Sequence, residues 1–564
     1  MPVFPFGDYR PDLSDLNTAD TSYMANVLPR GDGYGPVYDF DALSGALPAQ
    51  CRGYFFARKS DGTVAIFAAT ATKLYLLNST TFEWSDVSVG GGAYSSPDTD
   101  RNWQFAQFNN FVFATQRNAA VQVYDLTASS AFAALAGSPP RAGNIAVVNR
   151  FLVLCDLLDY PYRVHWSGLN ATTTWTSGTN YSDYQDLPSG GVPRVIRGGE
   201  LGVIIQDTEI RRMIYAAGSD VIFQIEKIAE SVGIIGSGSA AAAGNMVYMY
   251  STRGFLQLSP EGGMAPIGLE RVDRTFNEAF DDTALQYLQA AADPRAGVVF
   301  WAYRQAGTND DGFNRLIAYN YNLQKWSPPI SISGDYLSSM VQPGLTMEGL
   351  DAIAAGEMAI TGAANNGSGL IRLTVASTST LTTGDVKTVS AVGGTTEANG
   401  TWTITVVSGT TLDLQGSTFT NAYTSGGIIG GSLDALEFSL DELSSSSLSR
   451  LSLVNTEHKA GFFAGDELEA TLSTAEKQLD RGLRVDVNGL RPVTDAATVY
   501  GRIGMRDRPS GTVTYSTEAV TNDDGLIPQL VNTRLARAVI RIPAGETWTY
   551  ATGIEPDFMP AGLY

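Results

Sequence analysis

A repeated pattern of strand, turn and aromatic residue constrains the fold of this chain more than any other feature of its sequence. An alternating apolar strand ends at a polar turn residue, and an aromatic residue follows six or seven positions later. The clear pairs are Asn78 and Trp84, Asp125 and Phe132, Gly168 and Trp175, and Asn320 and Trp326, with weaker matches at Gly218, before Phe223, and at Ser259. A period of about 40–50 residues with several strands per unit is typical of β-propeller blades. The sequence therefore predicts an all-β fold that contains a β-propeller of about six blades.

The segments outside the repeat differ from it in composition. Residues 1–45 contain many Gly, Pro and Asp and show no period, which predicts a docking arm that closes the propeller or binds a partner. The propeller is predicted over 46–362, and an inserted small β-barrel-like module rich in Thr, Ser, Gly and Val over 363–432. A C-terminal β-sandwich-like domain is predicted over 433–564. An irregular array of β-sandwiches is the alternative architecture.

The charge balance is strongly acidic. The chain has 58 Asp and Glu against 37 Lys and Arg, a net charge of −21. A protein of this sign is not expected to hold nucleic-acid phosphates over a large face. No run approaches the ~18 apolar residues of a membrane span, and no secretory signal is visible, so we expect no membrane anchor.

Residues that could carry catalysis are sparse. His165 and His458 fall in different predicted domains. His165 is next to Trp166 in a predicted strand, where we expect it to have a packing role, and we expect His458 to lie at the surface. Cys51 and Cys155 are too few for a thiolate metal cluster, and they form one disulfide or two buried free thiols. Paired carboxylates such as Asp281-Asp282, Asp310-Asp311 and Asp523-Asp524 lie in predicted turns. We therefore assign no catalytic, cofactor-binding or metal-binding residue and do not expect an enzyme.

Arginine is concentrated in the last hundred residues, where it forms either a solvated surface or a basic face that docks on acidic neighbours or on another copy. The candidate assembly contacts are Arg10, Pro11, Asp12 and Tyr34 in the arm, and Arg506 and Arg508 in the C-terminal domain.

Two parts of the sequence resemble a known family. The opening Phe6-Gly-Asp-Tyr-Arg-Pro-Asp-Leu-Ser-Asp and Asn26-Val-Leu-Pro-Arg-Gly-Asp-Gly-Tyr-Gly-Pro resemble the start of the tail nozzle, or packaged-DNA stabilisation, proteins of short-tailed bacteriophages. The closing Gly504-Met-Arg-Asp-Arg and Gly545-Glu-Thr-Trp-Thr-Tyr-Ala resemble the C-terminal part of that family. The 363–432 module is similar to the first-catalytic-cysteine-half-domain (FCCH) fold of ubiquitin-activating enzymes, although it contains no Cys, so that chemistry is not inferred.

The resemblance implies a structural protein of the virion tail, assembled in the cytoplasm of the host bacterium. Its implied partners are further copies of itself in a ring, usually a hexamer, the tail adaptor and portal complex, and tail fibres or spikes. Double-stranded DNA would pass through the ring without specific binding, and an acidic wall would let it slide. No cofactor is implied.

Two other functions stay open at this stage. A propeller glycoside hydrolase acting on host surface polysaccharide would need paired carboxylates about 5–9.5 Å apart in an open cleft. A glycan-binding adhesin would use the aromatic residues of the inserted module to recognise a receptor.

Overall fold

The computed structural model describes residues 3–79, 81–219, 221–341, 358–378, 381–430, 449–478 and 484–561. The chain forms two compact units. The larger contains Met1–Leu77, Glu83–Val341 and Ser447–Tyr564, and the smaller contains Asn78–Phe82 and Gln342–Ser446. The predicted boundary at 432–433 lies outside the described residues.

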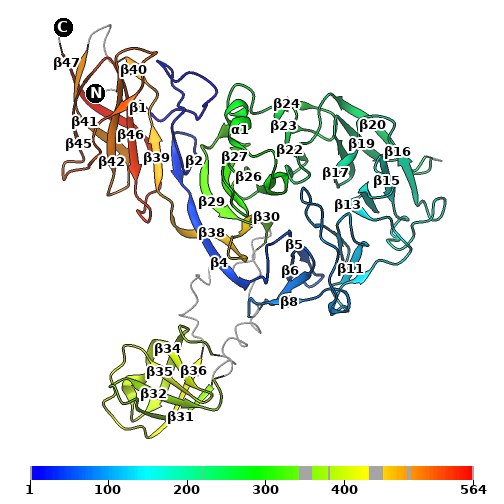
Figure 1. Cartoon of the computed structure of the whole chain (residues 1–564), viewed down its shortest axis with the longest axis horizontal. Helices are drawn as coiled ribbons and strands as arrows, with labels where there is room; N and C mark the ends of the chain where they lie inside the picture. The colour runs from blue at the N-terminus through cyan, green and yellow to red at the C-terminus, as the bar shows by residue number, and fades with distance from the viewer. Residues whose placement is uncertain are drawn as a thin grey trace. The chain divides into compact units, whose positions relative to one another are not determined.

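Seven small antiparallel sheets follow one another in the larger unit, in a propeller-like succession (Figure 1). Sheet 1 contains β5 (Gly53–Arg58), β6 (Val64–Ala69), β7 (Leu74–Leu77) and β8 (Trp84–Asp86). Sheet 2 contains β9 (Gln104–Phe108), β10 (Phe111–Thr115), β11 (Gln122–Asp125) and β12 (Ala133–Ala134). Sheet 3 contains β13 (Ala142–Val148), β14 (Phe151–Leu157), β15 (Arg163–Trp166) and β16 (Asp183–Asp186).

The next three sheets continue this order. Sheet 4 contains β17 (Pro193–Arg197), β18 (Leu201–Gln206), β19 (Glu209–Tyr215) and β20 (Phe223–Glu230). Sheet 5 contains β21 (Ala240–Ala243), β22 (Met246–Ser251), β23 (Gly254–Leu258) and β24 (Met264–Pro266). Sheet 6 contains β25 (Gln289–Asp293), β26 (Val298–Tyr303), β27 (Phe313–Asn320), β28 (Lys325–Trp326) and β29 (Ile330–Gly334). The short helix α1 (Asp273–Ala279) lies between sheets 5 and 6 along the chain.

In sheets 2, 4 and 6 the aromatic residue of the sequence repeat contacts the sheet before it or the segment that follows that sheet. Phe132 of sheet 2 lies 5.6 Å from Phe67 of sheet 1, between ring centroids. Phe223 of sheet 4 contacts Phe151 of sheet 3 at 4.9 Å, and Trp326 of sheet 6 donates to the carbonyl of Ile267, which follows sheet 5, at 2.7 Å. A small sheet cannot bury both faces alone, so this contact gives each repeat the apolar cover that its neighbour needs.

Sheet 7 closes the series with strands from three separate parts of the chain. It pairs β30 (Tyr336–Met340), β37 (Arg450–Val454), β38 (Lys459–Glu467) and β4 (Tyr38–Ala46) in that order. Trp84 of sheet 1 donates to Ser44 Oγ at 3.1 Å and to the Gly45 carbonyl at 3.0 Å, both on β4. The N-terminal segment and the segment after the insertion therefore complete the same sheet, which contacts sheet 1.

The smaller unit contains a closed six-stranded barrel. Its strand order is β31 (Met358–Asn365), β32 (Ile371–Val375), β35 (Thr411–Leu414), β34 (Gly400–Ser408), β33 (Val386–Gly393) and β36 (Ser425–Gly430). Buried and half-buried residues alternate along β32, so Ile371 and Leu373 fill the core beside Leu412 and Ile429. The small barrel-like module expected from the sequence is confirmed.

The last part of the chain builds two further sheets with a shared core. The first has the order β2 (Val27–Pro29), β3 (Tyr34–Pro36), β47 (Ala551–Pro560), β41 (Val485–Thr494) and β45 (Ile527–Thr533), with β1 (Phe4–Pro5) on β47. The second has the order β39 (Ala470–Ser473), β46 (Leu535–Ile542), β42 (Tyr500–Arg506) and β43 (Thr514–Tyr515), with β40 (Lys477–Gln478) on β46 and β44 (Ala519–Val520) on β42. Val487 and Ile554 of the first sheet and Ile503 and Ile540 of the second lie in one buried cluster.

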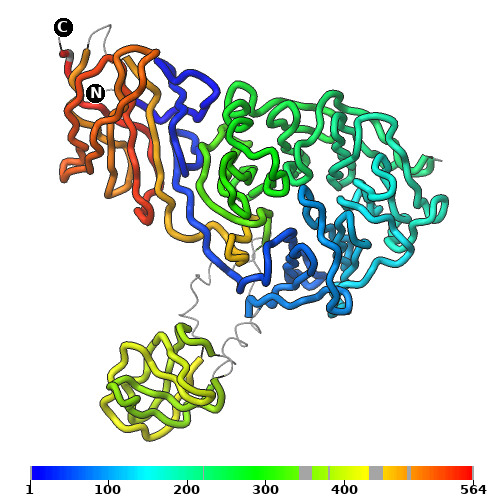
Figure 2. Tube along the Cα trace, in the orientation of Figure 1, coloured from blue at the N-terminus to red at the C-terminus, as the bar shows by residue number. Residues whose placement is uncertain are grey.

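The structure differs from the sequence-based expectations in three respects. Seven small sheets are present where about six blades were expected. Strands β37 and β38, placed by sequence in the C-terminal domain, belong to sheet 7. Residues 4–46 do not form a separate arm but contribute strands to sheet 7 and to the last domain, as Figure 2 shows in blue beside red and orange.

Cys51 and Cys155 are buried free thiols.

Candidate functional site

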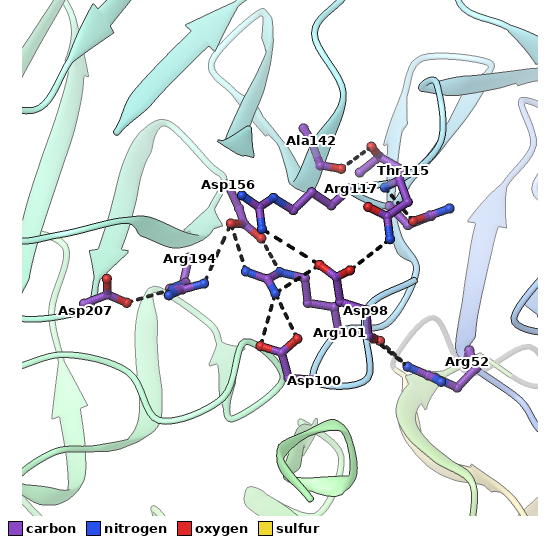
Figure 3. Close-up of polar contacts among 12 residues, drawn as sticks. Arg52, Asp98, Asp100, Arg101, Thr115, Arg117, Ala142, Asp156, Arg194 and Asp207 are labelled. Carbon is purple, nitrogen blue, oxygen red and sulfur yellow. Dashed lines mark hydrogen bonds and ion pairs between the residues drawn. The ribbon is translucent and has the colours of Figure 1, made fainter. Parts of the chain in front are cut away.

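A network of ion pairs joins sheets 2 to 4, and neutral hydrogen bonds from Arg52 extend it to sheet 1 (Figure 3). At its centre Arg101 donates from Nε to Asp156 Oδ2 at 2.6 Å and from its second terminal nitrogen to Asp156 Oδ1 at 3.3 Å. Its other terminal nitrogen donates to Asp100 at 2.9 Å and to Asp98 at 3.3 Å. Arg101 is 8% exposed and Asp156 is 2% exposed. Burial opposes the charge of Arg101, but its bonds to Asp156 and the nearby carboxylates outweigh burial and raise the pKa of the guanidinium.

The backbone of Asp156 is held in an unusual conformation. Its φ of 55° lies in the left-handed region, where Asp and Asn are more common than other non-glycine residues. Gly143 of β13 faces it, and a Cβ at that position would lie 2.2 Å from Asp156 Oδ2. A glycine is therefore required opposite Asp156 for the carboxylate to reach Arg101.

The network extends from both sides of this pair. Arg194 of β17 lies 3.9 Å from Asp156 Oδ1 and donates to Asp207 Oδ1 at 2.7 Å. On the other side Arg52, just before β5, donates to Asn102 Oδ1 at 2.7 Å and to the Asp98 carbonyl at 3.2 Å. The residues belong to four consecutive sheets or to the segments that enter them, so the network links these sheets around one buried ion pair, Arg101 with Asp156.

The chemistry of the network is that of a structural brace. Its carboxylates accept from guanidinium groups, so none of them stands free to take a proton from a substrate. Removing one partner of a buried ion pair typically costs about 3–5 kcal/mol, because the other charge is left uncompensated.

A cavity of about 260 Å³ lies where the first strands of the small sheets come together. Its lining includes Tyr54, Trp103, Arg197, Gln289 and Tyr336, from sheets 1, 2, 4, 6 and 7. A guanidinium nitrogen of Arg197 donates to the carbonyl of Ala240 at the start of sheet 5.

The two histidines have different surroundings. His165 packs edge-on against Trp175 at 5.4 Å, and burial lowers its pKa, which agrees with the expected packing role. His458 is not a plain surface residue, contrary to expectation: its Nδ1 lies 2.5 Å from Oδ2 of Asp335, whose side chain is fully buried. The Cys51 amide also donates to Asp335 at 3.1 Å, so this carboxylate joins sheet 7 to the start of sheet 1.

The expected assembly contacts of the N-terminal segment bind their own chain. Arg10 lies 3.6 Å from both Asp8 and Asp20, and Pro11 beside it is half-buried. The Asp12 carboxylate accepts from the amides of Arg274 and Thr275 at 2.8 and 2.9 Å, in the first turn of α1. Val272 at the helix start cannot cap that turn with its side chain, so Asp12 does so from a distant segment.

Tyr34 is a core residue. It is 2% exposed, and its hydroxyl donates to the Gly7 carbonyl at 2.8 Å. Burial raises its pKa. The sequence placed Tyr34 in an unpaired arm, and the pairing of β3 with β47 explains the difference.

The two C-terminal candidates behave differently from each other. Arg506 donates two bonds to the buried carboxylate of Glu476, at 2.7 and 2.5 Å, and the Glu476 amide bonds to the Asp15 carbonyl at 3.1 Å. Arg508 is exposed. Arg508 thus keeps a free surface for the predicted contact with another copy, whereas Arg506 is part of the internal frame.

Comparisons with known proteins add little. No protein-family model matches the chain, and no curated protein matches it. A chain of the solved "Crystal Structure of Mitotic Checkpoint Complex" aligns with 55% of this chain and 91% of its own length, at 12% identity and a TM-score of 0.32. A likeness this weak carries no argument.

In the part of the chain that the structure describes, no group of three or more His, Cys, Asp or Glu side chains is placed to hold a metal ion. No helix within the described ranges is long and apolar enough to cross a membrane.

The sequence singled out neither the Arg101–Asp156 pair nor Arg197. Asp98, Asp100 and Arg101 are close in sequence, but the decisive partner Asp156 lies 55 residues further on. A spacing of this size has no local signature. The only available signal was the unusual Asp within the apolar run of β14.

Proposed function

We propose that the seven small sheets form a seven-bladed propeller and that the chain is a structural component of a bacteriophage tail, a nozzle or hub ring that retains and then conducts viral DNA. The observation that carries this proposal is a set of small sheets completed by strands from distant parts of the chain, in a chain with more acidic than basic residues. Sheet 7 joins β4 to β38 across more than 400 residues, and the chain as a whole has a net charge of −21.

Lys and Arg contacts to phosphates hold a DNA backbone, whereas acidic walls repel it and let it pass. Sheets braced by buried ion pairs resist deformation better than separate helices joined by loops, which suits a part that bears the pressure of a packaged genome. The family resemblance supplies the arrangement: a homo-oligomeric ring, usually of six copies, beside the adaptor and portal complex and the tail fibres or spikes.

Electron microscopy of the purified full-length chain and of virions tests this proposal. We expect rings of several copies around a bore lined by acidic side chains, and the chain within the tail. Arg508→Glu should weaken ring formation, while Arg253→Glu, at another exposed arginine, should leave it unchanged. A chain that stays monomeric and is missing from the tail, or that binds duplex DNA tightly in low salt, contradicts the proposal.

A second candidate function rests on a different pocket. An open pocket of about 780 Å³ is lined by Asp310, Asp311 and the His458 that bonds to Asp335, together with Gln50, Ser333 and Thr456. Carboxylates in an open pocket suit the acid–base work of a glycoside hydrolase. Sugar released from host surface polysaccharide by the full-length chain, and lost in Asp311→Asn, would support this function; no release would remove it.

A further inference from the structure

Arg197 places a positive charge in the central cavity without an opposite charge beside it. Among the described residues, no carboxylate lies within 4.0 Å of its guanidinium, and Nε has no hydrogen-bond partner although it is closed off from solvent. Its one protein bond goes to the neutral carbonyl of Ala240. The surroundings of Arg197 differ from those of Arg101 and Arg194, whose guanidinium groups bond to carboxylates among the neighbouring small sheets.

The rest of the cavity does not supply the missing charge. Its lining is made of neutral residues apart from Arg197 and Asp100, and Asp100 is already bound to Arg101 at 2.9 Å. Arg52, which flanks the cavity, bonds only to neutral acceptors, the Asn102 side chain and the carbonyls of Asp98 and Arg101. The Tyr336 hydroxyl also lines the cavity, and no acceptor in the described part of the chain bonds to it.

The charges of Arg197 and Arg52 both affect the pKa of the Tyr336 hydroxyl. The cavity itself raises the pKa of Tyr336 by burial, and the nearby charges of Arg197 and Arg52 partly oppose that rise. Burial also lowers the pKa of Arg197 and of Arg52. The cavity thus presents the Arg197 guanidinium and the Tyr336 phenol as hydrogen-bond donors.

Arg197 is half-buried, but its Nε is closed off from solvent without a partner. Such a group is costly, and proteins normally give it a polar partner or a counter-charge. We propose that the central cavity is a binding site for a small oxyanion, with Arg197 as its main ligand and Tyr336 as a second donor. A guanidinium presents its N–H groups as a fork that matches the oxygen atoms of phosphate or carboxylate.

The position of the site indicates what the anion does. Arg197 ends β17 of sheet 4, Ala240 begins β21 of sheet 5, and Tyr336 begins β30 of sheet 7. An anion bound between Arg197 and Tyr336 would join first strands that are distant in sequence. The volume of about 260 Å³ admits an oxyanion with several water molecules but not a polymer.

Calorimetric titration of the full-length chain with sodium phosphate tests the site, with choline chloride at matched ionic strength as the blank. We expect saturable binding of one phosphate per chain and a rise of the melting temperature with phosphate. Arg197→Gln should weaken phosphate binding at least tenfold and remove the rise in melting temperature, and Tyr336→Phe should weaken binding severalfold. Arg253→Gln, at an exposed arginine outside the cavity, should bind as the wild type does.

The outcomes are decisive in both directions. Binding that is absent from the wild type, equal in Arg197→Gln, or matched by choline chloride would overturn the proposal. If Arg197→Gln does not fold, Tyr336→Phe decides, because it removes only a hydroxyl. Since neither variant touches Arg508 or the acidic surface, ring formation seen by electron microscopy is judged separately from this result.

Discussion

The barrel and the larger unit differ in how far apart in sequence the strands that hold each of them together lie. The barrel takes all six strands from Met358–Gly430, and each strand pairs with others from the same short stretch. In the larger unit sheets 1 to 6 also pair consecutive strands, but the remaining sheets depend on pairs that are far apart in sequence: β4 with β38, β3 with β47 and β30 with β37. Local pairing makes a unit that forms quickly and independently, whereas distant pairing makes a frame that is complete only when both ends of the chain are present.

The pairing of β30 with β37 shows how the two units coexist. Met340 at the end of β30 lies opposite Arg450 at the start of β37. The two strands are therefore neighbours in sheet 7, paired as in a hairpin, although the inserted unit separates them in sequence. The barrel unit is inserted where a tight turn would suffice. An insertion at such a point leaves the pairing of sheet 7 intact, and long insertions in loops cost little in loop-closure entropy.

Removing residues 1–46 should have the largest effect on this comparison. The deletion takes β4 from sheet 7, takes β1 to β3 from the last domain, and removes the Asp12 cap. We expect the larger unit to lose its cooperative unfolding transition while the barrel keeps its own. Calorimetry and circular dichroism of the truncated chain measure both transitions.

The matched control replaces residues 341–449 by Asn-Gly, the preferred two-residue hairpin turn. This variant should lose the barrel transition and keep that of the larger unit. A truncated chain that still shows both transitions would show that the N-terminal strands are not needed for closure.

Asp156→Asn should have the next largest effect, a loss of about 3–5 kcal/mol in the free energy of unfolding of the larger unit. Asn tolerates the positive φ, so the change removes charge without adding backbone strain. The control is Asp186→Asn, because Asp186 accepts two bonds from Arg163 at 2.7 and 2.9 Å but is 60% exposed. Surface pairs of this kind are worth about 0–1 kcal/mol. Chemical denaturation of both variants gives the difference, and equal losses would contradict a buried brace.

Asp12→Ala should cost about 0.5–2 kcal/mol, the usual value of a lost helix cap. The change leaves the amides of Arg274 and Thr275 without their acceptor. Asp20→Ala breaks the 3.6 Å pair with Arg10 and should cost less. Hydrogen exchange at the α1 amides, faster in Asp12→Ala alone, is the specific readout.

The smallest effects are opposite pH dependences of the two units. In the larger unit, burial raises the pKa of Asp273 from its usual value near 4 to about 6. The folded state then binds more protons than the unfolded chain between pH 4 and 6, so stability falls as pH rises through that window and is level above it. Asp273→Asn should remove this slope.

In the barrel the sign is reversed. The Thr420 and Asn421 amides bond to Glu397 and lower its pKa to about 2. This contribution is fully present above about pH 4.5 and is lost as pH falls towards 2. Glu397→Gln should flatten the acid side of the barrel transition, and the two transitions should therefore diverge when melts are run from pH 6 to pH 3. Parallel shifts of both transitions would contradict these assignments.

The parts of the fold that repeat locally were predictable from the sequence. The spacing of Trp84, Phe132, Trp175 and Trp326 marked real sheets, because Phe132, Trp175 and Trp326 contact the neighbouring repeat and Trp84 bonds to β4 of sheet 7. The alternation along 371–375 similarly marked a strand of the barrel. Sheet 7 was not predictable, because its strands come from three places and none of them repeats the pattern.

The polar sites were likewise not predictable, because the partners of their side chains lie far away in sequence. Asp12 and Tyr34 looked like free groups in an unpaired segment, and their partners lie on α1 and in the strands of the last domain. Arg101 and Arg197 are set apart only by what surrounds them, a buried carboxylate in one case and none in the other. No local spacing in the sequence encodes that difference.

The composition of sheet 7 also affects how the protein is synthesised. Ser44 on β4 and Ala460 on β38 are bonded at 2.9 Å yet lie 416 residues apart. At about 5–20 residues per second, a ribosome needs on the order of 20–80 s to make the partner of β4. During that interval the nascent chain carries an open strand edge, which is where chaperones bind and where neighbouring nascent chains can cross-pair. Slow translation of the middle of the gene would lengthen this exposure, so expression yield should depend on the translation rate between these two strands.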